Sequence, residues 1–194
     1  MDTILLGLKE TLSAIKHPIL CELEKPLKRS KIEQILDFDK LGKNDEYIAL
    51  YENTGWVHGS KLMNENYVEF SSFGCLLDFS DATSLYYLKK KEKYLFKKMP
   101  FITNKDGAFV VVDLDEKGES YGKLFACPMG DFLFETSDNS VLITIYDSVK
   151  TFIQTVDECY KQGAYKLNGR LLDIDSEKER NISRKLNPKS VYWK

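Results

Sequence analysis

Apolar and polar positions come in short alternating blocks through the middle of the chain. Three blocks are rich in β-branched and aromatic residues, and two polar clusters with glycine separate them. The blocks are residues 99–103, 108–114 and 123–127, and the clusters are residues 104–107 and 115–120. Connections this short join antiparallel strands, because a parallel crossover needs about a dozen residues or more. The pattern therefore predicts a three-stranded antiparallel meander.

Apolar residues at steps of three and four predict helices on both sides of this meander. The clearest helix follows the apolar strand pattern at 141–146, where Asp147 and Ser148 precede the first turn and Gly163 closes the last. Four earlier helices are predicted: residues 4–15, a segment with Ser30 as its N-cap, a segment from 43 to a left-handed cap at Gly55, and a segment begun by Ser80 and Asp81.

Further short apolar runs predict strands at 67–70, at 73–79 with a bend at Gly74, at 132–135, and as a hairpin at 165–174. The fold class predicted is α+β, with a mainly antiparallel central sheet flanked by helices. We expect a helical extension at 1–29, a main domain at 30–175 and a basic tail at 176–194. The aromatic tip of that tail, Tyr192 and Trp193, is expected to dock on the domain.

Composition and charge narrow the class of protein. A chain of 194 residues with 43% hydrophobic residues can bury a sizeable core in one domain. Its net charge of −2 gives no general attraction to nucleic acid or to an anionic membrane, and we expect neither as a partner. Lysines between 89 and 98 predict a solvated basic helix face, with a nucleic-acid patch as the alternative.

The N-terminal residues have neither a signal-peptide nor a membrane-span pattern, so a cytoplasmic location is expected. The cysteines are spaced far apart among apolar neighbours, which predicts buried reduced thiols at positions 21, 75, 127 and 159. His17 and His58 have no partners at metal-ligand spacing, so the sequence predicts no metal site and no cofactor.

No phosphate-binding loop, nucleophile elbow, dinucleotide motif or calcium loop stands in the sequence. Two acidic pairs remain as candidate chemistry: Asp113 with Asp115, and Glu116 with Glu119. Asp113 and Asp115 share the parity of a strand and could form a general acid and base, or they could simply shape a turn. With nothing else to support catalysis, we expect a protein that is not an enzyme.

The order of several segments resembles the SUKH superfamily, also called the Smi/Knr family. The resemblance covers roughly residues 30–165 and rests on Leu-Gly-Lys-Asn-Asp-Glu-Tyr-Ile-Ala-Leu-Tyr-Glu-Asn-Thr-Gly-Trp at 41–56, Met-Pro-Phe-Ile-Thr-Asn-Lys-Asp-Gly at 99–107, Val-Asp-Leu-Asp at 112–115, Gly-Lys-Leu-Phe at 122–125 and Tyr-Asp-Ser-Val-Lys-Thr-Phe-Ile at 146–153. The chain departs from the family pattern at Gly42, where proline is usual, at Asn53-Thr54-Gly55, and at Lys150 and Thr151.

The resemblance implies a SUKH-like main domain and a binding function without catalysis. Members are mostly bacterial immunity proteins that neutralise a cognate toxin domain of polymorphic or contact-dependent toxin systems, in several cases a nuclease. A fungal branch acts in cell-wall regulation, so an intracellular scaffold or regulatory adaptor is the alternative function. A third possible function is that of an uncharacterised enzyme that uses Asp113 and Asp115.

An acidic surface would suit a toxin with a basic substrate cleft. The residues predicted to contact the partner are Trp56, Asp113, Asp115, Glu116, Glu119, Asp131 and Glu135. Trp56 would be an aromatic anchor within this polar surface. The alternative for Trp56 is a place in the hydrophobic core.

Overall fold

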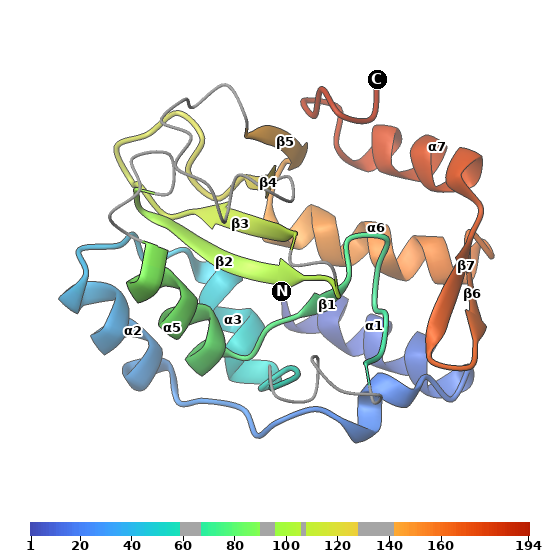
Figure 1. The fold of residues 1–194 in the computed structure, drawn as a ribbon, viewed down its shortest axis with the longest axis horizontal. Helices are drawn as coiled ribbons and strands as arrows, with labels where there is room; N and C mark the ends of the chain where they lie inside the picture. Colours follow the sequence, from blue (N-terminus) through green and yellow to red (C-terminus); the bar gives the residue numbers. More distant parts are fainter. Residues whose placement is uncertain (59–66, 90–95, 106–107, 128–141) are drawn as a thin grey trace.

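A five-stranded antiparallel sheet forms the centre of the protein (Figure 1). The computed structural model describes residues 1–58, 67–89, 96–105, 108–127 and 142–194. The strands lie in sequence order: β1 (Cys75–Leu76), β2 (Lys98–Thr103), β3 (Phe109–Asp113), β4 (Leu124–Cys127) and β5 (Ile143–Tyr146). The α+β class, the predicted meander and its antiparallel sense are confirmed.

The helices pack around this sheet and against one another (Figure 1). They are α1 (Asp2–Ala14), α2 (Arg29–Phe38), α3 (Asp45–Asn53), α5 (Phe79–Lys89), α6 (Val149–Lys161) and α7 (Ser176–Leu186), with a 3-10 turn, η1, at Pro18–Cys21. A hairpin of β6 (Tyr165–Asn168) and β7 (Leu171–Ile174) lies beyond the end of α6, as the sequence predicted. Helix α6 contacts α1, α3 and α7, so it is the central helix of the fold.

Alternation along β3 gives the sheet two buried faces. Val110 and Val112 point into the main core, where Phe101 and Phe152 meet with ring centroids 5.5 Å apart. Val111 belongs to a smaller cluster with Phe125 and Cys127 on the opposite face. Because successive side chains of a strand point to opposite faces, a one-residue slip in β3 would exchange the two sets.

Both ends of the chain join the main core. Three leucines of α1 are 1% exposed, and Trp193 is 5% exposed. The indole Nε1 of Trp193 donates a hydrogen bond to the carbonyl oxygen of Ile145 at 2.6 Å. The predicted docking of the C-terminal tip is thus confirmed for Trp193, while Tyr192 stays partly exposed. The division at 1–29, 30–175 and 176–194 remains a prediction, but all three segments share one hydrophobic core.

Two strand predictions are wrong in extent. Residues 67–70 form no strand, and only Cys75–Leu76 of the predicted strand 73–79 is one. The reason is a tight turn in which Ser71 and Gly74 exchange backbone hydrogen bonds, with Gly74 at a φ of +111° as the predicted bend. The strand predicted at 132–135 lies outside the described residues.

Several predicted helix ends also differ. Helix α2 begins at Arg29 with Lys28 as its N-cap instead of Ser30, and α5 begins at Phe79, where Asp78 accepts the backbone N–H of Asp81 at 2.7 Å. Gly55 is not a left-handed cap. The left-handed residue is Trp56, with a φ of +55°.

Glycine at position 55 is instead required by space, since a Cβ there would lie 2.5 Å from the backbone oxygen of Lys25. The cysteine prediction also needs one correction. Cys21 is exposed, while Cys75, Cys127 and Cys159 are buried free thiols as predicted.

Candidate functional site

The acidic turn between β3 and β4 is built around Asp113. Asp113 is 2% exposed. Its Oδ1 accepts a hydrogen bond from the backbone N–H of Asp115 at 2.8 Å, and its Oδ2 accepts one from the hydroxyl of Ser120 at 2.6 Å. Lys98 Nζ lies 3.6 Å from the same Oδ2. Asp113 therefore shapes the turn, which supports the turn-forming interpretation of this acid.

Asp115 is paired with a lysine at the base of the same turn. Its Oδ1 lies 2.9 Å from Lys97 Nζ, and this hydrogen bond lowers the pKa of the Asp115 carboxyl. A carboxylate with a lowered pKa is a poor proton acceptor near neutral pH. The geometry of Asp113 and Asp115 thus fits a structural pair better than a general acid and base.

Glu116 and Glu119 are exposed on this turn, and Glu116 connects it to the segment between α2 and α3. Its Oε1 accepts the backbone N–H of Lys43 at 3.2 Å. Next to it, the N–H of Gly42 donates to the carbonyl of Leu114 at 2.7 Å. A proline at position 42 would have no N–H for this bond.

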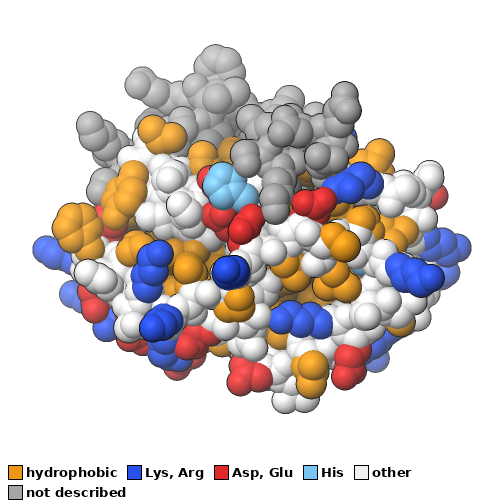
Figure 2. All heavy atoms as spheres, turned by 90° about the horizontal axis from the view of Figure 1, so that it is seen from below, with side chains coloured by type: hydrophobic (Ala, Val, Ile, Leu, Met, Phe, Trp, Pro, Cys, Tyr) orange, Lys and Arg blue, Asp and Glu red, His pale blue; other side chains and the backbone are white. Residues whose placement is uncertain are grey.

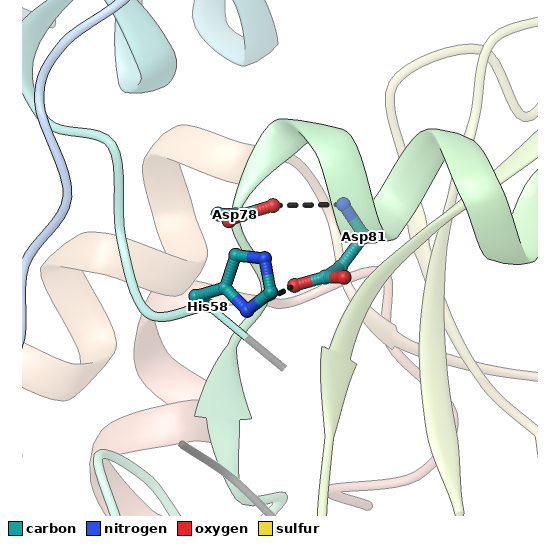
Figure 3. A group of neighbouring side chains, drawn as sticks. All are labelled: His58, Asp78 and Asp81. Atoms are coloured by element: carbon teal, nitrogen blue, oxygen red, sulfur yellow. Dashed lines mark hydrogen bonds and ion pairs between the residues drawn. The ribbon is translucent and has the colours of Figure 1, made fainter. Parts of the chain in front are cut away.

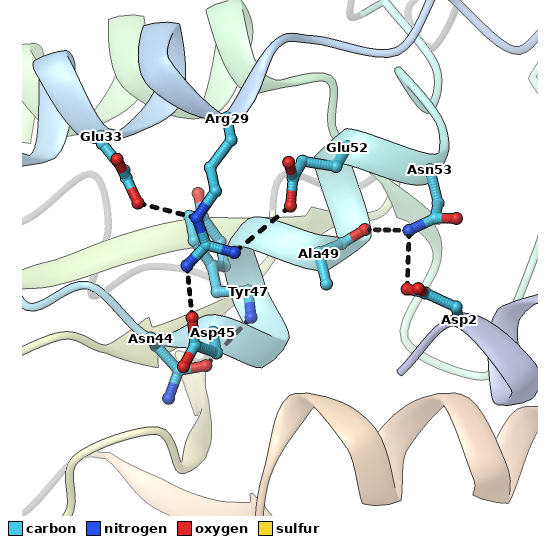
Figure 4. A network of polar contacts seen from close by, with 9 residues as sticks. All are labelled: Asp2, Arg29, Glu33, Asn44, Asp45, Tyr47, Ala49, Glu52 and Asn53. Atoms are coloured by element: carbon cyan, nitrogen blue, oxygen red, sulfur yellow. Dashed lines mark hydrogen bonds and ion pairs between the residues drawn. The ribbon is translucent and has the colours of Figure 1, made fainter.

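Helices α2 and α3 carry further carboxylates beside this turn, held by Arg29 (Figure 4). The guanidinium contacts Glu33 at 2.8 Å, Glu52 at 3.4 Å and, through Nη2, Asp45. Hydrogen bonds to Asp45 and Glu33 raise the pKa of Arg29 above its ordinary range. The network ties the start of α2 to both ends of α3.

A second cation, Lys43, joins this network to the turn. Its ammonium lies 2.9 Å from Asp37, and it interacts electrostatically with Glu33 and Glu116 as well. We call the exposed or half-exposed carboxylates of Glu33, Asp37, Asp45, Glu52 and Glu116 the acidic surface. Within this set two cations face five carboxylates, so these side chains carry a net negative charge, while the exposed Lys28, Lys31, Lys40 and Lys117 of the same segments add positive charge around them.

The other predicted contact residues fall elsewhere. Trp56 is 3% exposed and packs against Phe70 with ring centroids 5.3 Å apart, so it is a core residue and not an exposed anchor. Of the two places that the sequence left open for Trp56, an exposed anchor or the hydrophobic core, the structure shows the core. Asp131 and Glu135 lie outside the described residues.

A separate group of side chains gathers at the start of α5: His58, Asp78 and Asp81 (Figure 3). One ligand-type atom of each residue lies within 4.8 Å of the others. His58 Nδ1 is 3.7 Å from Asp81 Oδ2, with 46% of the imidazole and 25% of the carboxylate exposed. The pKa of the Asp78 carboxyl is raised, mainly because the group is buried.

Backbone contacts bring this group together from distant parts of the sequence. Val57 forms a parallel bridge with Leu77, and the N–H of Asp78 donates to the carbonyl of Val57 at 3.1 Å. The residues that follow this bridge, His58 and Asp78, therefore lie side by side. Sequence spacing alone gave no sign of this group, because 19 residues lie between His58 and Asp78.

His58 and Asp78 also line a groove of about 480 Å³ between α2 and α5. Its wall is mostly apolar, with contributions from Leu27, Ile35 and Phe79. On the face shown in Figure 2, a histidine lies directly beside acidic side chains, and basic side chains are scattered around hydrophobic ones. The arrangement can hold a ligand that is polar at one end and apolar along its length.

A larger hollow of about 660 Å³ lies among α1, α6 and α7. Its buried acid, Asp157, accepts hydrogen bonds from the hydroxyl of Thr11 at 2.6 Å and from Lys161 at 2.6 Å. These contacts join α1 to α6 and account for the buried acid as a structural feature.

Among the described residues, no helix has the length and apolar character needed to cross a membrane. No protein-family model matches the chain, and no curated protein shows significant similarity to it.

Proposed function

We propose that this chain is a non-enzymatic immunity protein that binds and neutralises a cognate toxin domain of a polymorphic or contact-dependent toxin system. The proposal combines the resemblance to the SUKH superfamily with the acidic surface, which is the observation that carries it. Under this proposal the protein acts in the cytoplasm by covering the active site of the toxin, which for a nuclease is a basic cleft.

The acidic surface suits such a role because its charge is held in a fixed arrangement. Asp45 keeps 83% and Asp37 60% of its side chain exposed, although each contacts a cation. Electrostatic complementarity of this kind speeds association and selects the partner, with a smaller effect on raw affinity. The cations Arg29 and Lys43 fix the carboxylates in position, so little side-chain freedom is lost on binding.

The elements that carry the surface are also rigidly joined. The turn between β3 and β4 contacts the α2–α3 connection through Gly42 and Lys43, and the N–H of Lys150 at the start of α6 donates to Glu46 at 2.9 Å. A preformed binding surface needs no folding on association, which favours tight inhibition.

Co-expression with the toxin domain encoded beside this chain tests the proposal. The wild-type chain is expected to restore growth of cells that make the toxin. The double variant Asp37→Lys/Asp45→Lys is expected to lose most of this protection, because it reverses two strongly exposed charges of the acidic surface.

A matched control is the double variant Asp173→Lys/Glu177→Lys, which makes the same change in charge at exposed positions of β7 and α7. Equal expression and equal melting temperatures of the two variants are required for the comparison. Failure of the wild-type chain to protect against the adjacent toxin would overturn the proposal. Pull-down of signalling proteins without any toxin domain would favour the adaptor function instead.

A further inference from the structure

The geometry points to a divalent metal site of the zinc class formed by His58, Asp78 and Asp81 at the start of α5. Nothing in the sequence predicted a metal, and the site is independent of the acidic surface. The residues come from two segments that the Val57–Leu77 bridge holds side by side.

The distances suit a metal ion after small side-chain rotations. Zinc binds histidine nitrogen and carboxylate oxygen at about 2.0–2.2 Å, which places the ligands of a tetrahedral site roughly 3.3 Å apart. The ligand atoms here lie within 4.8 Å of one another, and His58 Nδ1 is 3.7 Å from Asp81 Oδ2. Contraction by about 0.4 Å for the His58–Asp81 pair, and by up to about 1.5 Å for the widest pair, is within the reach of χ rotations, so the backbone can stay in place.

The donor set selects the class of metal. Calcium and magnesium prefer oxygen ligands alone, whereas imidazole nitrogen suits zinc, copper, iron and nickel. Three protein ligands, the number found in catalytic zinc sites, leave a fourth position for water or another group. His58 and Asp78 line the groove between α2 and α5, so an exogenous group can enter from that side.

The two carboxylates of the group attract a cation, although the N-terminus of α5 repels one. The N-terminus of α5 carries partial positive charge, which opposes a bound cation. Asp78 already offsets part of this charge by accepting the N–H of Asp81 at 2.7 Å, and Asp81 adds a second carboxylate.

Capping of helix α5 explains the position of Asp78, but not the positions of His58 and the Asp81 carboxylate. It explains one carboxylate, since aspartate is a common N-cap. It does not require an imidazole and a second carboxylate to converge on the same point. Metal binding uses all three residues, and an oxygen that caps a helix retains lone-pair capacity for a metal.

Calorimetric titration with Zn²⁺ tests this inference. The exposed thiol of Cys21 could bind zinc by itself, so every protein in the experiment carries Cys21→Ser. In this background we expect one zinc ion per chain. His58→Ala and Asp81→Asn are each expected to weaken binding about tenfold or more, since even outer-shell changes at metal sites cost that much.

Asp173→Asn is the matched control, because it removes an exposed carboxylate from β7, away from α5, and should leave zinc affinity unchanged. Thermal melting with and without Zn²⁺ provides a second readout: the ion should raise the melting temperature of the Cys21→Ser protein and of the control, but not of the two site variants. Absence of stoichiometric binding, or affinity that His58→Ala and Asp81→Asn leave unchanged in folded protein, would overturn the inference.

Discussion

Trp193 is expected to be among the most important single side chains for stability, although it is the penultimate residue. It is 5% exposed, and its ring lies 5.9 Å from that of Tyr146 and 6.0 Å from that of Phe73. Its Nε1 donates to the Ile145 carbonyl in the last strand of the sheet. The side chain therefore fastens the C-terminal segment to the edge of the sheet.

The expected cost of Trp193→Ala follows from these contacts. Truncation of a buried aromatic residue to alanine costs about 3–5 kcal/mol, and loss of the hydrogen bond contributes about 1 kcal/mol of that change. For a chain of this length, about 4 kcal/mol corresponds to a fall in melting temperature of roughly 10 °C. Urea denaturation followed by circular dichroism measures the free energy of unfolding directly.

Two further variants separate the contributions. Trp193→Phe keeps most of the packing and removes the donor, so it should cost less than Trp193→Ala, by roughly 1–2 kcal/mol in total. Val191→Ala, at a position 60% exposed, should change stability by no more than about 0.5 kcal/mol. If Trp193→Ala costs less than about 1 kcal/mol, the C-terminal tip is not an integral part of the core and this reasoning is wrong.

Three other predictions concern single positions. Gly42→Ala should destabilise the protein by about 1–3 kcal/mol in the same assay, because the new Cβ would lie 2.9 Å from the Leu114 carbonyl oxygen and closer still to two side chains; a neutral effect would contradict the close approach. Burial lowers the pKa of His17 from 6.5 to about 4, so the unfolded chain binds the extra proton first and up to about 3 kcal/mol of stability should be lost as pH falls from about 6.5 toward 4. The variant His17→Gln should lack this part of the pH dependence, and an unchanged profile would refute it. A thiol reagent should label Cys21 alone in the native protein, and rapid labelling of a second cysteine would contradict the burial of the others.

The parts of the fold that the sequence predicts well have strong local signals. Alternating apolar residues with glycine-containing turns indicated the meander, and Ser148 indicated the start of α6, where it forms a capping box with Thr151. The segment 176–194, expected from the sequence to be a basic tail, contains helix α7, and its sequence carries helix signals. Asp175 caps it, acids occupy its first turn and bases its last, and Ile182 is buried.

The sites depend on contacts that local patterns cannot show. Glu116 was predicted from its turn, but the carboxylates of α2 and α3 join it only because the chain at Gly42 packs against that turn. His58 meets Asp78 only through the bridge between Val57 and Leu77. The left-handed Trp56 was equally unpredictable, since a bulky residue adopts that conformation only when tertiary packing imposes it.

Direct binding of the purified chain to the purified neighbouring toxin domain tests the central claim most sharply. We predict a one-to-one complex whose association rate falls as salt concentration rises, and a marked loss of association rate for Asp37→Lys/Asp45→Lys but not for Asp173→Lys/Glu177→Lys. A complex that forms equally fast with both double variants would contradict the role of the acidic surface. Absence of any complex would contradict the proposed function itself.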